Sequence, residues 1–204
     1  MIAPGGHRRA LVPLRVPGKG RGFTLVEVLV AGGLFVILCI AILGVYRAGL
    51  NTEAVTAQRT MLQDSLQYGM KAFDRDIGDA SASLATSGST SVAVLVPVFD
   101  NAGAPTAFSD TVTFAASGTA VYQSVAPGVG SSRKAFLNKR LLENVPDPYP
   151  SPGLFTYWTR ANGALAQVAP ADATIVRVTL IQQATYGSRV QKVDLVQDIR
   201  LRNR

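Results

Sequence analysis

Residues 19–46 have the sequence KGRGFTLVEVLVAGGLFVILCIAILGVY, in which basic residues are followed by a long apolar run. No residue from position 28 to position 45 is charged. A helix needs about 20 predominantly apolar residues, each adding about 1.5 Å, to cross the hydrocarbon core of a bilayer. This stretch therefore predicts a transmembrane helix over residues 23–50.

The positive charge of the chain is concentrated ahead of that helix. The formal net charge is +7, and residues 1–22 contain five basic side chains and no acidic one: Arg8, Arg9, Arg15, Lys19 and Arg21. The other 15 of the 20 basic residues face 13 acidic ones, so residues 23–204 are nearly neutral. We therefore expect no direct binding to nucleic acid.

Two ordinary explanations of the apolar run leave one residue unexplained. A signal anchor would keep its basic flank in the cytoplasm. A cleaved secretory signal needs small residues after the run, and Tyr46 and Arg47 make a poor site near Ala48. Neither accounts for Glu27, because a carboxylate near hydrocarbon costs several kcal/mol unless it is paired or neutralised. Gly22, at the boundary between the basic and apolar zones, indicates a flexible and accessible peptide bond.

The hexapeptide Gly22-Phe23-Thr24-Leu25-Val26-Glu27 closely resembles the processing signal of type IV pilins and type II secretion pseudopilins. The resemblance implies that a prepilin peptidase cuts between Gly22 and Phe23 and removes residues 1–22 as a basic leader. It also implies N-methylation of Phe23 and identifies Glu27 as the acid needed for assembly.

Physical chemistry supplies a reason for Glu27 under this resemblance. Cleavage creates a free ammonium at Phe23, and the Glu27 carboxylate of a neighbouring subunit can pair with it. Docking would then remove the cost of an unpaired acid in an apolar environment. Two alternatives stay open: Glu27 pairs with the amine of its own chain, or its side chain reaches the membrane interface.

The resemblance also implies partners and a location. The partners are the prepilin peptidase, other pilin or pseudopilin subunits, an inner-membrane assembly platform and membrane lipid. The chain would cross the cytoplasmic membrane once, with a cytoplasmic N-terminus and an exported head, before joining a pilus or pseudopilus. No proline occurs between Pro17 and Pro97, whereas many major pilins carry one in this helix, so a minor subunit is favoured.

An amphipathic helix is predicted over residues 51–78, continuing the apolar helix to give one element from about Phe23 to Ile77. Apolar residues recur there at helical spacing: Val55, Leu62, Leu66, Met70, Phe73 and Ile77. Such a stripe is typical of a helix that buries one face, here against a sheet.

The remainder is predicted to be β-rich over residues 91–204. Extended runs are expected at 91–99, 111–115, 120–125, 154–159, 164–168, 174–182 and 189–202. Asn162-Gly163 indicates a hairpin, residues 78–91 and 126–134 indicate loops, and residues 147–153 are rich in turn-forming prolines. The expected fold is therefore α+β and pilin-like: one long N-terminal helix packed on a mostly antiparallel sheet.

Three segments look similar to PilW-type minor pilins and J-type pseudopilins. They are residues 62–78, the run Phe155-Thr-Tyr-Trp-Thr159 and the closing Arg200-Leu-Arg-Asn-Arg.

The residues needed for most enzymatic mechanisms are lacking in the expected mature chain. The only histidine is His7, in the leader, and the only cysteine is Cys39, within the apolar run. This leaves no Ser-His-Asp or Cys-His catalysis and no metal site built on His or Cys ligands. We therefore expect no catalytic residue, no metal site and no cofactor.

Asp74, Asp76 and Asp79 are the nearest approach to a carboxylate site. Their spacing only partly matches a Ca²⁺ loop, because Gly78 occupies a ligand position and no glutamate closes the loop. We interpret the three aspartates as a solvated helix end. Similarly, Arg133-Lys134 and Lys139-Arg140 are interpreted as ordinary surface.

Three hypotheses follow. The first is a minor pilin or pseudopilin that polymerises through its N-terminal helix. The second is a membrane-anchored, exported binding domain that does not polymerise. The third is an exported hydrolase that uses carboxylates such as Asp74 or Asp76.

Overall fold

The computed structural model describes residues 22–100, 102–187 and 189–202. The predicted leader therefore lies outside the described residues, except for Gly22. The chain divides into two units, residues 1–50 and 51–204, with the division inside the single long helix α1 (Leu25–Gly78). The predicted long helix is confirmed, with its ends within two residues of the expected positions.

The part of α1 in the first unit exposes its apolar side chains. Among residues 25–50, Cys39 alone is half-buried and every other residue is exposed. Phe35 is 65% exposed and Leu34 is 62% exposed. Among the described residues, α1 is the one helix that is long and apolar enough to cross a membrane.

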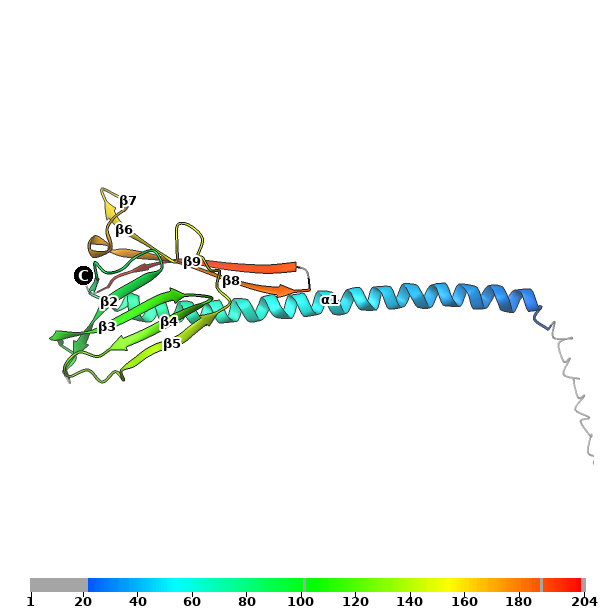
Figure 1. The fold of residues 1–204 in the computed structure, drawn as a ribbon, viewed down its shortest axis with the longest axis horizontal. Helices are drawn as coiled ribbons and strands as arrows, with labels where there is room; N and C mark the ends of the chain where they lie inside the picture. Colours follow the sequence, from blue (N-terminus) through cyan, green and yellow to red (C-terminus); the bar gives the residue numbers. More distant parts are fainter. Residues whose placement is uncertain (1–21, 101, 188, 203–204) are drawn as a thin grey trace, which may run out of the picture. The chain divides into compact units, whose positions relative to one another are not determined.

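The second unit combines the rest of α1 with two antiparallel sheets (Figure 1). The first sheet has the order β1-β2-β3-β4-β5. Its strands are β1 (Ala82–Ser83), β2 (Ser91–Phe99), β3 (Pro105–Ser117), β4 (Ala120–Ala126) and β5 (Phe136–Glu143). The second sheet has the order β7-β6-β8-β9. Its strands are β6 (Phe155–Ala161), β7 (Ala164–Gln167), β8 (Ile175–Tyr186) and β9 (Arg189–Arg200), with a 3-10 turn η1 (Pro170–Asp172) before β8.

The expected α+β class is confirmed, and the structure adds details that were not predicted. The β-residues form two sheets, β1 lies in a segment expected to be a loop, and β5 was not anticipated. The Asn162-Gly163 hairpin is confirmed: these residues have φ values of 50° and 84° and join β6 to β7. Positive φ at both central positions is what a two-residue type I′ turn requires.

One aromatic residue of α1 joins both sheets. The Phe73 ring is fully buried, with its centroid 4.4 Å from that of Phe114 in β3 and 5.8 Å from that of Phe155 in β6. Leu66 and Ile77 lie on the same face of α1 and are also buried. Burying a side chain of this size contributes about 1.5–3 kcal/mol, so this face holds the helix to both sheets.

Gly69 permits a close approach between α1 and β5. A Cβ atom at this position would lie 2.9 Å from both Cδ atoms of Leu142, which is itself buried. A residue with a side chain here would therefore require the Leu142 side chain to move.

The proline-rich segment before β6 is tied to the second sheet by Tyr149. Its hydroxyl donates to the Thr179 carbonyl at 2.5 Å and accepts the Ile181 amide at 2.8 Å. Burial raises the pKa of the Tyr149 hydroxyl above its usual range, so it remains a neutral donor.

Candidate functional site

The predicted site residues Gly22, Phe23 and Glu27 lie at the start of α1. Thr24 precedes the first helical residue, and its Oγ1 accepts the Glu27 amide at 3.2 Å. In return, Oε2 of Glu27 accepts the Thr24 amide at 2.9 Å and the Thr24 hydroxyl at 3.0 Å. This reciprocal pair is a capping box, which satisfies backbone donors that a helix start otherwise leaves unbonded.

The capping box was not anticipated, although the sequence carries its signature. A threonine followed three residues later by a glutamate, just before an apolar run, is the usual sequence pattern. The interaction gives Glu27 a local structural role in addition to any role in assembly. Any test of Glu27 must therefore separate its charge from its capping bonds.

The surroundings of this helix start are open. Phe23 is 86% exposed, Leu25 is 81% exposed, and nothing lies within 4 Å of the place where Gly22 would carry a Cβ. Both capping bonds reach Oε2 of Glu27, and Oε1 accepts no hydrogen bond from the described residues. In this uncut chain the Phe23 nitrogen belongs to a peptide bond, so an ammonium at Phe23 requires cleavage.

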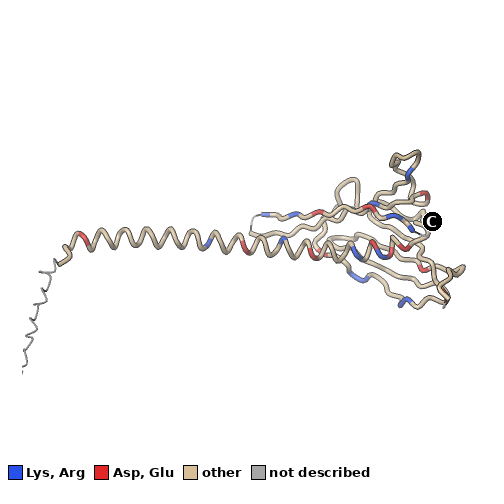
Figure 2. The backbone as a smooth tube through the Cα atoms, turned by 180° about the vertical axis from the view of Figure 1, so that it is seen from behind, with Lys and Arg blue, Asp and Glu red and all other residues tan. Residues whose placement is uncertain are grey.

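Charge is sparse along the first half of α1 (Figure 2). Between Leu25 and Leu50 the sequence has two charged residues, Glu27 and Arg47. Glu27 therefore stands alone at the start of an otherwise uncharged helical surface of 19 residues, positions 28–46. An isolated carboxylate in this position is costly in hydrocarbon unless a cation joins it.

The second candidate group, Asp74, Asp76 and Asp79, does not form a common site. The Asp74 carboxylate accepts the Gln197 amide at 3.3 Å, and Asp79 pairs with Arg202 at 3.6 Å. Among the described residues, no group of three or more His, Cys, Asp or Glu side chains could hold a metal ion.

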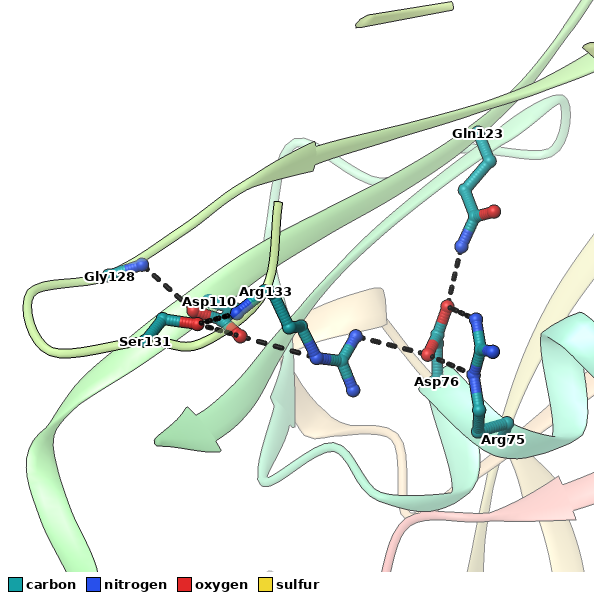
Figure 3. Close-up of polar contacts among 7 residues, drawn as sticks. All are labelled: Arg75, Asp76, Asp110, Gln123, Gly128, Ser131 and Arg133. Atoms are coloured by element: carbon teal, nitrogen blue, oxygen red, sulfur yellow. Dashed lines mark hydrogen bonds and ion pairs between the residues drawn. The ribbon is translucent and has the colours of Figure 1, made fainter. Parts of the chain in front are cut away.

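Asp76 corrects the interpretation of these aspartates as a solvated helix end. Its side chain is fully buried, and four hydrogen bonds reach it (Figure 3). Arg75 donates two of them at 2.9 and 3.1 Å, Arg133 donates one at 3.1 Å, and Gln123 donates one at 2.5 Å. A buried carboxylate is stable only with such partners, and it presents no surface to a substrate.

Arg133 extends the network to a second buried carboxylate and corrects its own interpretation as surface. Its Nε lies 3.3 Å from Oδ2 of Asp110, which also accepts the Ser131 hydroxyl at 3.0 Å. The other Asp110 oxygen accepts the Gly128 amide at 2.8 Å. The loop between β4 and β5 is thereby fastened to the end of α1.

Arg75 closes the network on the solvent side. Its hydrogen bonds to Asp76 raise the pKa of the guanidinium above its usual value, so it remains charged. The network joins two arginines and two aspartates to Gln123 and Ser131. Its geometry is that of a structural clamp.

Comparisons with known proteins gave no match to a family model, a curated protein or a solved structure. The resemblance of residues 22–27 to the processing signal of pilins therefore stays a prediction from sequence.

Proposed function

We propose that this chain is a structural subunit of the pilin or pseudopilin class, acting by polymerisation rather than turnover. In this proposal a prepilin peptidase cuts between Gly22 and Phe23 and methylates the new terminus. The first half of α1 holds the subunit in the cytoplasmic membrane as a single-pass anchor. The subunit then leaves the lipid by joining a filament as a minor component.

The observation that carries the proposal is the exposed, uncharged surface of residues 28–46 of α1, which directly follows the acidic residue Glu27. Large apolar side chains such as Phe35 and Leu34 are more than half exposed, and no described residue covers them. Surfaces of this kind require lipid or other helices around them. Glu27 stands beside the bond whose cleavage creates a cation, so acid and amine can neutralise each other in a dry environment.

Oε1 of Glu27 accepts no hydrogen bond within the described part of the chain, which is consistent with pairing after assembly. The capping bonds occupy Oε2, so an ammonium can approach the other oxygen without breaking the helix start. A second subunit supplies that ammonium at its own Phe23. Register along a filament would follow, because a slipped subunit leaves both charges unmatched.

The processing step is tested by intact mass and N-terminal sequencing of full-length protein from cells that contain a prepilin peptidase. We expect a chain that begins at Phe23 and carries one additional methyl group. An uncut chain, or one cut near Ala48, would contradict the proposal.

Three variants separate the charge of Glu27 from its capping bonds. Glu27→Gln removes the charge but keeps the bonds, because glutamine also completes a capping box. Thr24→Ala removes the capping hydroxyl but keeps the charge, and Glu27→Ala removes both. We expect all three to be processed, and only the two Glu27 variants to be lost from the sheared filament fraction on an immunoblot. Normal assembly of Glu27→Gln would reject the charge-pairing role.

The second candidate is an anchored, exported binding domain that does not polymerise. The capping box favours this second candidate, because its hydrogen bonds give Glu27 a structural role that requires no second subunit. This candidate predicts that none of the three variants changes the fraction recovered in filaments, since no filament would contain the protein.

A further inference from the structure

A small pocket opens beside the Asp76 clamp in the second unit. Its volume is about 300 Å³, and it lies where the end of α1 meets β4, β5 and their connecting loop. Its lining consists of Arg75, Gln123, Val125, Arg133, Lys134 and Phe136. None of these lining residues belongs to residues 22–50, on which the proposed anchoring and charge pairing depend.

The lining is cationic and contains no carboxylate. Three of its six side chains are Arg75, Arg133 and Lys134, which come from the helix and from the loop. The side chains of Arg75 and Arg133 remain 63% and 30% exposed while they bind Asp76. Asp76 itself is fully buried and is not part of the lining.

Donors remain available at this surface. Arg75 bonds through Nε and Nη2, and Arg133 through Nε and Nη1, which leaves Nη1 of Arg75 and Nη2 of Arg133 without an acceptor in the described chain (Figure 3). Lys134 forms no ion pair with any described residue and is exposed. Lys139 adds a further cation nearby, with its Nζ 5.8 Å from the centroid of the Phe136 ring, so the pocket surroundings carry a net positive charge.

A single carboxylate matches this arrangement. The unbonded guanidinium nitrogens and the Lys134 ammonium can donate charge-assisted hydrogen bonds to a carboxylate, and the net positive charge favours an anion. Val125 and Phe136 supply an apolar wall for the methylenes that carry such a group. We propose that this pocket binds the carboxylate of a glutamate or aspartate side chain presented by a partner protein.

Two observations favour a protein as the source of the carboxylate. Residues 51–75 of α1 extend for roughly 36 Å at about 1.5 Å per residue, so Arg75 lies several Debye lengths along the helix from the start of its unit. Arg75 is therefore well separated along the helix from the uncharged residues 28–45, which are the ones suited to lipid. The pocket is also small and open, so it suits one side chain of a larger contact better than an enclosed free solute.

The test uses the full chain in neutral detergent micelles and follows amide and arginine Nε–H signals by NMR. The probe is N-acetyl-glutamate amide, whose only charge is its side chain, and the matched control is N-acetyl-glutamine amide. We expect saturable shifts at Arg75, Val125, Arg133 and Phe136 with a Kd of about 1–10 mM for the glutamate probe and none for the glutamine control.

Lys134→Ala tests the site without disturbing the clamp, because Lys134 has no partner in the described structure. We expect it to weaken binding of the glutamate probe by about 3- to 10-fold. Lys192→Ala, which removes an exposed cation of β9, should leave binding unchanged. Equal shifts with the glutamine control, or unchanged affinity in Lys134→Ala, would overturn the proposal.

Two further arms distinguish the source of the anion. Inorganic phosphate that bound at the same signals more tightly than the glutamate probe would overturn the assignment to a carboxylate. Vesicles containing anionic phospholipid that protected the same signals would assign the pocket to lipid instead. Because none of these measurements involves cleavage at Gly22 or filament assembly, the pocket and the proposed function can fail independently.

Discussion

The two halves of α1 contain similar apolar side chains in opposite surroundings. Phe35 is 65% exposed in the first half, whereas Phe73 is fully buried between two sheets in the second. Their acids differ in the same way, since Glu27 is exposed and bonded to Thr24 while Asp76 is enclosed by two arginines and a glutamine. The contribution of a residue of α1 to stability therefore depends on whether the rest of the chain buries it, and not on its residue type alone.

The largest loss of stability is expected from substitution of a fully buried residue of α1. Phe73→Ala should lower the free energy of unfolding of the second unit by about 3–5 kcal/mol, because it removes contacts to both sheets and leaves a cavity. Phe35→Ala, the matched substitution in the exposed half, should change it by less than about 0.5 kcal/mol. Urea unfolding in detergent, followed by the near-ultraviolet circular dichroism of Trp158, measures both. Similar values for the two variants would remove the distinction between the halves.

A smaller loss is expected when the enclosed acid is neutralised. Asp76→Asn keeps the shape of the side chain but removes the charge that two arginines share, and should cost about 1–3 kcal/mol. Glu143→Gln is the control, because Glu143 pairs with Arg140 at 2.8 Å while both side chains are more than half exposed. That pair should contribute about 0–1 kcal/mol. A loss for Asp76→Asn no larger than the control would mean that the clamp adds little to stability.

The smallest effect concerns the cross-strand pair Arg177–Asp198, which joins β8 to β9 at 2.6 Å. The hydrogen bonds from Arg177 lower the pKa of Asp198 in the folded protein. Because the pKa of Asp198 is lower in the folded than in the unfolded protein, its ionised form stabilises the folded state at pH values above the unfolded pKa, which is near 4. This stabilisation is lost as the pH falls through the pKa of the folded protein. Because Asp198 is 41% exposed, the contribution at pH 7 should stay below about 1 kcal/mol.

Asp198→Asn provides the measurement for that pair. The variant should be slightly less stable than the natural chain at pH 7, and the difference should shrink as the pH falls below about 4. Urea midpoints at a series of pH values follow it, and added salt should also reduce the difference. A difference that grew at acidic pH would contradict the assigned direction of the pKa change.

Most of the regular elements were predictable because their signals are local. The long helix, the strand from Ser91 to Phe99 and the Asn162-Gly163 hairpin each follow from apolar spacing or from turn-forming residues. β5 was missed because it lacks the alternation of a half-buried strand: most of its residues are exposed, and its pairing with β4 is irregular. β1 was missed because two residues carry no period at all.

The candidate site was predictable to different extents at the two ends of α1. Residues 22–27 were selected from sequence as a processing signal, which stays a prediction, and the bonds between Thr24 and Glu27 were overlooked. The burial of Asp76 was not foreseeable from its neighbours, because its partner Arg133 lies 57 positions away along the chain. The pocket beside Asp76 was not foreseeable for the same reason, since its cations come from a helix and from a loop that is distant in sequence.

Local order along the chain was sufficient for the apolar length of α1, its capped start and the alternation of its strands, because each depends on residues only a few positions apart. The tertiary structure alone determined that two sheets share the covered face of α1, which aspartate is buried and where a cationic pocket opens. These outcomes depend on contacts between residues far apart in sequence, and such contacts leave no periodic pattern in the local sequence from which they could be predicted.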